Sequence, residues 1–270
     1  MLRNCNILSD MRIFQYMAGE LIVIKIGSNV LTDTQGRLDK RSFRRIAGQV
    51  KKLYQQNKRL IIVSSGAITC GTERLKIDYR QRTIPQKQAA AAVGQSLLMN
   101  YYMKYLRPIP LGQVLLTAEA ISNKERSQNL LNTIEQLLKM RVIPIINEND
   151  SVVVDEIKFG DNDSLSARVA ALVKAHRLMI MTDIDGLYDS NPRQNPQAKL
   201  LHTVEKVTPE IIKVAGGTGT YKGTGGMFSK VQAAKLATEA GIETYLVNGY
   251  RRNILFDALK HTAECTWFRV

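Results

Sequence analysis

The stretch that decides the fold reads LIVIKI at residues 21–26, and Gly27 and Ser28 follow it directly. Such a short, almost continuous apolar run, rich in β-branched residues, is typical of a strand buried on both faces of a parallel sheet. Lys25 interrupts the run, and a lysine buried there without a partner would cost free energy. Its ammonium group either reaches the surface or faces a bound anion, and the adjacent glycine turn favours the anion.

Five more short apolar runs follow along the chain, each succeeded by small or polar residues. They are LIIV at 60–63, LGQVLL at 111–116, VIPII at 142–146, LMIM at 178–181 and TYLV at 244–247. Longer segments with apolar residues at helical spacing lie between them. This alternation predicts an α/β fold with a mostly parallel sheet that helices cover on both sides.

One of these helical segments lies at 85–108, with a proline at each limit. Proline favours the first turn of a helix and cannot continue one, so it suits both limits. An apolar or aromatic side chain recurs every fourth residue, at Val93, Leu97, Tyr101 and Tyr105. We expect this stripe to face the core.

Polar and small residues gather where the predicted strands end. Ligands of open α/β sheets bind outside the carboxyl ends of the strands, so we expect these residues to surround one shared crevice. They are Lys25, Gly27, Ser65, Gly66, Asn147, Asp150, Thr182 and Asp183.

The regular pattern begins only at Leu21. We expect residues 1–20 to form a flexible extension and residues 21–270 to form a single domain with two lobes. The segment 189–199 is rich in Pro, Asn and Gln, which is typical of a surface excursion and not of a domain boundary.

Composition excludes several classes of protein. Of the 270 residues, 44% are hydrophobic and 23% are charged, which argues against disorder. No apolar run approaches the roughly 20 residues of a membrane-spanning helix, and three separated cysteines exclude a disulfide scaffold and a cysteine-rich zinc site. We therefore expect a cytoplasmic protein with no membrane partner and no metal site of its own. The net charge of +14 favours nucleotides, acidic metabolites or nucleic acid as ligands.

A glycine-rich segment, AGGTGTYKGTGGM at 215–227, precedes a helical pattern at 229–240. Glycines let consecutive backbone N–H groups converge, and a helix N-terminus adds partial positive charge, a combination that binds phosphate. Lys222 and Lys230 add cations on either side. A surface loop remains the other interpretation, and the chain has neither a Walker A motif nor the protein-kinase motifs.

The positions of the histidines limit the chemistry. His176, His202 and His261 lie near none of the predicted strand ends. An acceptor hydroxyl would need a base to remove its proton, whereas a glutamate side chain, with a pKa of about 4.3, is already ionised at neutral pH. A site of lysines, glycines and backbone amides therefore suits phosphoryl transfer to a carboxylate.

An ordered series of motifs resembles the glutamate 5-kinases, a branch of the amino acid kinase family. The resemblance extends from Leu21 over nearly the whole remaining chain. The motifs are VIKIGSNVLT (23–32), VSSGAITCG (63–71), QAAAAVGQS (88–96), INENDSVV (146–153), IKFGDNDSLSA (157–167), TDIDGLY (182–188) and GTGGMFSK (223–230). Any one motif would be weak evidence, whereas the ordered set is specific.

The resemblance implies an open, mainly parallel αβα sandwich with an N-lobe for glutamate and a C-lobe for ATP. It implies that ATP, with Mg²⁺, phosphorylates the side-chain carboxylate of L-glutamate to L-glutamyl 5-phosphate, the first step of proline biosynthesis. Carried over to this sequence, Lys25 and Lys230 would stabilise charge on the transferring phosphoryl group, and Asp163 would orient both lysines.

The resemblance also assigns binding residues. For glutamate they are Ser65, Asp150 and Asn162, with Asp150 meeting the α-ammonium group. For ATP they are Lys25, Thr182, Asp183, Thr224, Gly225, Gly226, Met227, Phe228, Ser229 and Lys230. The family's usual Asp-Pro-Arg is Asn-Pro-Arg here at 191–193, and its usual threonine before the last lysine is here Ser229.

Partners are implied by the resemblance as well. It implies a homo-oligomer, makes proline a candidate feedback inhibitor, and suggests that the acyl phosphate is handed over to glutamyl phosphate reductase. Many members carry a C-terminal PUA domain, for which we expect no room in this chain.

Two rival functions stay open at this point. A sister kinase would phosphorylate N-acetylglutamate, aspartate, carbamate or UMP, although the motifs at 146–153 and 157–167 favour free glutamate. A nucleic-acid-binding protein would explain the charge of +14. Its cations are dispersed, however, and no aromatic-rich RNA-binding strand accompanies them, so we expect no specific nucleic-acid partner.

Overall fold

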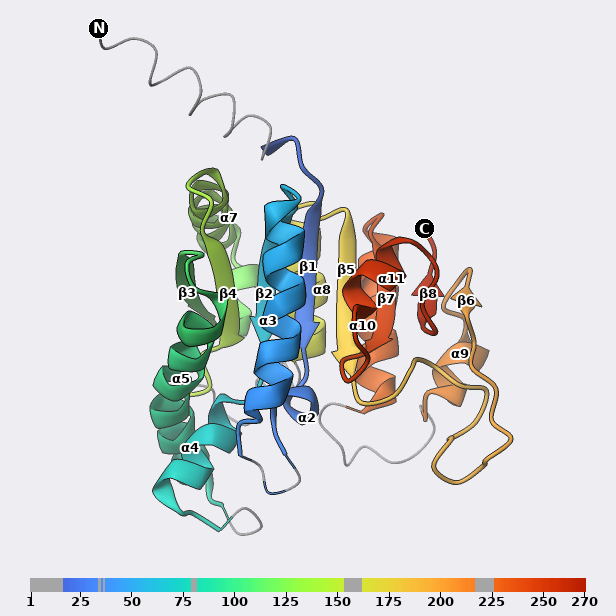
Figure 1. The fold of residues 1–270 in the computed structure, drawn as a ribbon, viewed down its shortest axis with the longest axis horizontal. Coiled ribbons are helices and arrows are strands. Elements are labelled where there is room, and N and C mark those ends of the chain that lie inside the picture. Colours follow the sequence, from blue (N-terminus) through green and yellow to red (C-terminus); the bar gives the residue numbers. More distant parts are fainter. Residues whose placement is uncertain (1–16, 34, 36, 79–81, 153–161, 217–225) are drawn as a thin grey trace, which may run out of the picture.

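A single mixed sheet runs through the centre of the molecule (Figure 1). The computed structural model describes residues 17–33, 35, 37–78, 82–152, 162–216 and 226–270. Within these residues the strand order is β3-β4-β2-β1-β5-β7-β8-β6. All neighbouring strands are parallel except β7 and β8. The strands are β1 (Leu21–Ile26), β2 (Arg59–Ser64), β3 (Leu111–Leu116), β4 (Ile143–Glu148), β5 (Arg177–Thr182), β6 (Thr203–Val204), β7 (Glu243–Asn248) and β8 (Thr266–Phe268).

Helices cover both faces of this sheet, which confirms the predicted αβα arrangement. One core lies between the sheet and α3 (Lys40–Gln55), α5 (Ile84–Leu106) and α11 (Ile254–Leu259). The other lies between the sheet and α7 (Lys124–Lys139), α8 (Asn162–Leu172) and α10 (Met227–Glu239). Figure 1 shows α3 in front of the sheet and α8 behind it. The remaining helices are α2 (Ser28–Leu31), α4 (Ala67–Leu75), α6 (Ala118–Ser122) and α9 (Pro209–Val214).

No helix in the described part of the chain is both long enough and apolar enough to cross a bilayer.

The alternation of side chains along β1 decides where its lysine points. Successive residues of a strand face opposite sides of the sheet. Ile22, Ile24 and Ile26 therefore join the core under α3 and α5. Leu21 and Val23 join the opposite core, under α8 and α10. Lys25 has the parity of this second set, so its ammonium group extends toward α8 and α10.

The predicted stripe on α5 is only partly right, because Tyr101 and Tyr105 pack against the core whereas Val93 does not. The helix begins at a capping box formed by Thr83 and Gln86, with the expected proline in its first turn. Its side toward the core carries Ala90, Ala91, Gly94, Gln95, Leu98, Met99, Tyr102 and Leu106, whereas Val93 is exposed and the other stripe residues are half-buried. Small residues face the core in the first half of α5, because α5 packs closely against α4 there, at a distance that long side chains would prevent.

Glycines at the α4–α5 contact make this close approach feasible. A Cβ atom on Gly94 would lie 1.8 Å from the backbone oxygen of Ala67, and one on Gly71 would lie 1.7 Å from that of Ala90. The tyrosines of the stripe instead cover Phe43 on α3, with ring centroids 5.1 Å away for Tyr101 and 6.0 Å for Tyr105.

Two strands were not predicted from the sequence. β6 and β8 extend the sheet beyond β7, and β8 is the strand that runs antiparallel to its neighbour. With two and three residues respectively, they are too short to show an apolar pattern.

The α4–α5 contact yields a stability prediction. Gly94→Ala should lower the free energy of unfolding by about 3 kcal/mol, because the new methyl group overlaps the backbone of α4. Gly48→Ala in α3 is the matched control, since nothing lies within 4 Å of its Cβ position. The free energy of unfolding of the Gly48→Ala control should rise by about 0.5–1 kcal/mol, because alanine has a higher helix propensity than glycine. Urea denaturation of both variants measures the difference, and equal midpoints would contradict this account of the packing.

Candidate active site

The carboxyl ends of the central strands open into a cavity of about 550 Å³. Lys25 on β1, Ser65 after β2 and Thr182 on β5 reach it from the sheet, and Lys230 reaches it from α10. The ends of β1, β2 and β5 therefore meet at one crevice, whereas Gly66, Asn147 and Asp150, which were predicted to share it, are not among the residues that line it. The further predicted residues that line this cavity are Gly27, Asp183, Gly226 and Met227.

Three buried charges form the inner wall of the site. Lys25 Nζ makes an ion pair with Asp163 Oδ1, and Lys230 Nζ lies 3.1 Å from Asp163 Oδ2. The Ser229 hydroxyl donates to Asp163 Oδ2 at 2.8 Å. Asp163 is fully buried, and the two lysines are 3% and 7% exposed. Lys25 thus does not reach the surface, and the group that it faces here is a carboxylate of the protein itself.

Secondary structure explains this convergence. Asp163 lies in the first turn of α8, where the helix dipole favours a negative charge. Strand parity turns Lys25 toward the same helix, and Lys230 lies in the first turns of α10 beside it. Two ammonium groups and one carboxylate leave a net charge of +1 at the cavity wall. Such a wall favours an anionic ligand.

Asn162 and Ser65, two of the residues predicted to bind glutamate, are joined by a hydrogen bond. Asn162 Nδ2 lies 3.1 Å from Ser65 Oγ, 3.2 Å from the backbone oxygen of Ser64 and 2.9 Å from Asn147 Oδ1. Asn162 therefore stands beside Asp163 on one side and the end of β2 on the other. Asn147 was predicted only as a strand end, and the structure gives it this additional contact.

Asp150, the third residue predicted for glutamate, lies in the turn that follows β4. Burial of its carboxyl group raises the pKa of Asp150 to about 6. A carboxylate in such a place is poorly solvated and gains most from a cationic ligand.

The opposite end of the cavity combines polar and apolar groups. Burial opposes ionisation of Asp183, but hydrogen bonds from its own backbone N–H, the Thr182 hydroxyl and Arg193 lower the pKa of Asp183. Ile184, Leu187, Tyr188, Val214, Ala215 and Met227 add an apolar lining. This end can therefore hold a planar, partly apolar ring next to the charged wall.

One supporting network was missed by sequence reasoning. Asp185 accepts from Arg251 at 2.6 and 2.8 Å and from Asn248 Nδ2 at 3.0 Å. These contacts fasten the segment after β5 to the segment after β7. Asn248-Gly249 at a strand end was the available signal, but a partner more than 60 residues away does not show in a sequence pattern.

Some predicted residues do not line the cavity or fall outside the described residues. Phe228 is half-buried on α10 and is not among the residues that line the cavity. The same holds for Asp150, Asn162, Asp163 and Ser229. Thr224 and Gly225, like residues 1–16 of the predicted extension, lie outside the described residues.

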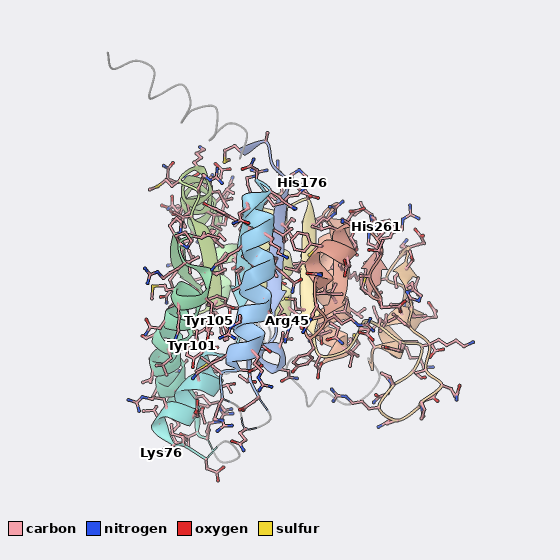
Figure 2. All side chains as sticks on the ribbon, viewed as in Figure 1. Arg45, Lys76, Tyr101, Tyr105, His176 and His261 are labelled. Carbon is pink, nitrogen blue, oxygen red and sulfur yellow. The ribbon has the colours of Figure 1, made fainter. Side chains whose placement is uncertain are left out.

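The histidines lie elsewhere. Figure 2 shows His176 at the end of the sheet opposite to α2, and His261 beside the C-terminal strands. His176 Nδ1 accepts from the backbone N–H of Leu21, and His261 packs on Trp267 with ring centroids 4.3 Å apart. Across the described ranges, no three His, Cys, Asp or Glu side chains gather as metal ligands do.

A comparison with sequence models of protein families identifies the family to which the chain belongs. The model described as the amino acid kinase family matches residues 20–248. This chain belongs to the amino acid kinase family.

Individual members of the amino acid kinase family are similar to the chain over most of its length. The glutamate 5-kinase of Clostridium tetani is 49% identical over 249 residues, which cover 92% of this chain and 93% of the relative. That of Clostridium acetobutylicum is 48% identical with the same coverage. That of Geobacter sulfurreducens is 50% identical over 239 residues, which cover 88% of this chain and 64% of the relative.

Solved structures of the same fold are more distant in sequence. Carbamate kinase from Giardia lamblia bound to AMP-PNP superposes with a TM-score of 0.67 at 16% identity, over 93% of this chain and 99% of that one. UMP kinase from Ureaplasma parvum superposes with a TM-score of 0.62 at 18% identity, over 94% of this chain and 100% of that one. At these identities the likeness concerns the fold.

The buried ion pairs predict a large effect on stability. Asp163→Asn should lower the free energy of unfolding by about 3 kcal/mol, because two buried ammonium groups lose their countercharge. Adding Lys25→Met to Asp163→Asn should recover part of this loss, since one uncompensated charge is gone. Chemical denaturation of the three proteins tests both statements. An unchanged stability of Asp163→Asn would show that the carboxylate does not hold the lysines.

Proposed function

We propose that this protein transfers the γ-phosphoryl group of ATP to the side-chain carboxylate of L-glutamate and forms L-glutamyl 5-phosphate. The observation that carries the proposal is the buried pairing of Lys25 and Lys230 with Asp163 at the wall of one cavity. About half of all aligned residues are identical to those of glutamate 5-kinases over nine tenths of the chain, which supports this choice of substrate.

The two lysines supply the main stabilisation of the transition state. Negative charge on the transferring phosphoryl oxygens increases or redistributes during transfer, and fixed ammonium groups in a site of low polarity stabilise it without reorganisation. Asp163 holds both ammonium groups in place before the reactants bind. Because the acceptor is already a carboxylate, no base has to remove a proton, and the distant histidines fit this requirement.

ATP enters this site with Mg²⁺, which neutralises phosphate charge when bound. Both carboxylate oxygens of Asp163 already contact an ammonium group. Asp163 therefore has little capacity left as a metal ligand, and we expect phosphate oxygens and water to hold the ion. The nucleotide base occupies the apolar end near Leu187 and Met227.

Glutamate binds on the side of Ser65, Asn162 and Asp150. The Asp150 carboxylate meets the α-ammonium group, which supplies the cation that its buried position lacks. The substrate's side-chain carboxylate then extends toward the lysines. An N-acetylated substrate has no positive charge for Asp150, so the same site discriminates against it.

The cellular setting follows from the same proposal. The reaction is the first step of proline biosynthesis, and we place it in the cytoplasm. A homo-oligomer, feedback inhibition by proline and hand-over of the acyl phosphate to glutamyl phosphate reductase stay predictions of the sequence resemblance.

A coupled assay of ADP release tests the substrate. We expect turnover of ATP to require L-glutamate and kcat/KM to fall by about a hundredfold or more with N-acetyl-L-glutamate. Lys230→Ala should lower kcat by about a hundredfold with little change in the KM for ATP, because its interaction is strongest in the transition state. A preference for N-acetyl-L-glutamate, carbamate or UMP would assign the protein to a sister activity.

The pKa of Asp150, about 6, predicts a pH dependence of glutamate binding. A raised carboxyl pKa means that the charged form is lost as the pH falls through 6. From pH 7 to pH 5 its ionised fraction falls from about nine tenths to about one tenth, so the KM for glutamate should rise about tenfold. The KM for ATP serves as the internal control and should change little. A KM for glutamate that stays constant over this range would remove Asp150 from the substrate site.

A further inference from the structure

A buried glutamine on α5 has no part in the site described above. Gln95 is 7% exposed, and its Oε1 accepts from Asn147 Nδ2 at 2.9 Å. Its own Nε2 atom is buried and has no hydrogen-bond partner among the described residues. Burial of an incompletely paired amide costs free energy that an apolar side chain of the same length would not cost. What Gln95 provides is therefore its oxygen, directed at Asn147.

Backbone groups fix the direction of this hydrogen-bond chain. The N–H of Glu148 can only donate, and it donates to Asn147 Oδ1 at 2.9 Å. The other end of the Asn147 amide is consequently Nδ2, a donor, and Gln95 must present an acceptor to it. Rotation of the Asn147 amide by half a turn would place two donors against each other at the Glu148 end and two acceptors against each other at the Gln95 end.

The chain continues from Asn147 into the proposed substrate site. Asn147 Oδ1 also accepts from Asn162 Nδ2 at 2.9 Å, and the same Nδ2 points at the backbone oxygen of Ser64. With three oxygens of Asn147, Ser64 and Ser65 around Nδ2, the Asn162 amide has one permitted orientation. Asn162 Oδ1 is thereby the free end, buried and without a hydrogen-bond partner among the described residues.

We propose that Gln95 is a positioning residue for the amino-acid substrate: the Glu148 N–H sets which way the Asn147 amide points, and the Gln95 oxygen holds its Nδ2 end in place, which steadies the direction in which Asn162 presents Oδ1. An unpaired carbonyl oxygen in a half-buried site accepts from a cationic N–H donor, which is the α-ammonium group of an amino acid. Gln95 does not touch the substrate and acts through two side chains. This inference rests on the proposed function, since it concerns glutamate binding.

Three variants separate positioning from stability. Gln95→Met keeps the length of the side chain and removes the acceptor, whereas Gln95→Glu keeps an oxygen for Asn147 in either ionisation state. Gln49→Met is the matched control. Gln49 on α3 is equally buried, its Oε1 accepts from the backbone N–H of Leu255 at 3.0 Å, and its Nε2 is also without a partner among the described residues.

Kinetics, calorimetry and thermal unfolding of these variants test the inference. For Gln95→Met we expect the KM for glutamate, and the Kd for glutamate by calorimetry, to rise about tenfold, with kcat and the KM for ATP nearly unchanged. Gln95→Glu should restore most of the affinity. Gln49→Met should lower Tm without changing either KM.

The outcomes distinguish this inference from the proposed function. If wild type neither binds nor phosphorylates glutamate, the proposed function fails. If wild type is active and Gln95→Met lowers only Tm, as Gln49→Met does, Gln95 has a merely structural role and the inference is overturned. The inference would also be overturned if Gln95→Glu weakened glutamate binding as much as Gln95→Met does, because the hydrogen-bond acceptor for Asn147 would then not be the property that matters.

Discussion

One carboxylate that neutralises two buried ammonium groups is the constraint on which the rest of the structure depends. Without Asp163, the buried ammonium groups of Lys25 and Lys230 would lose their shared countercharge, and their repulsion would drive them apart. The fold meets this constraint with ordinary elements. Strand parity directs one lysine, and the first turns of two neighbouring helices place the carboxylate and the other lysine.

The resulting site is organised for charge and not for proton transfer. Its cations come from a strand and a helix and its polar groups from strand ends, whereas His176 and His261 lie away from it. Transfer of a phosphoryl group to a carboxylate requires reactants that are held in line and charge that is neutralised. In the proposed function, glutamate lies on the side of Ser65, and the nucleotide base lies at the apolar end of the cavity near Leu187 and Met227.

The sequence was sufficient for elements that local pattern determines, and insufficient for contacts between distant elements. The run around Lys25 predicted a buried strand with a crevice at its end, and the strand and a cavity at its carboxyl end are both present. The predicted stripe on α5 failed at Val93, because close packing of α4 on α5 selects small residues, which the periodicity of large side chains does not reveal. Gln95 and the Asp185–Arg251 pair were missed, since each depends on a partner 50 or more residues away.

The most direct measurement is a crystal structure with a non-hydrolysable ATP analogue, Mg²⁺ and L-glutamate bound together. The account predicts that the γ-phosphate lies within hydrogen-bond distance of Nζ of both Lys25 and Lys230, with the glutamate side-chain carboxylate in line with it. Asp163 should contact the lysines and not the phosphate. A γ-phosphate bound away from either lysine, with the two ammonium groups pointing to different ligands or to solvent, would contradict the account.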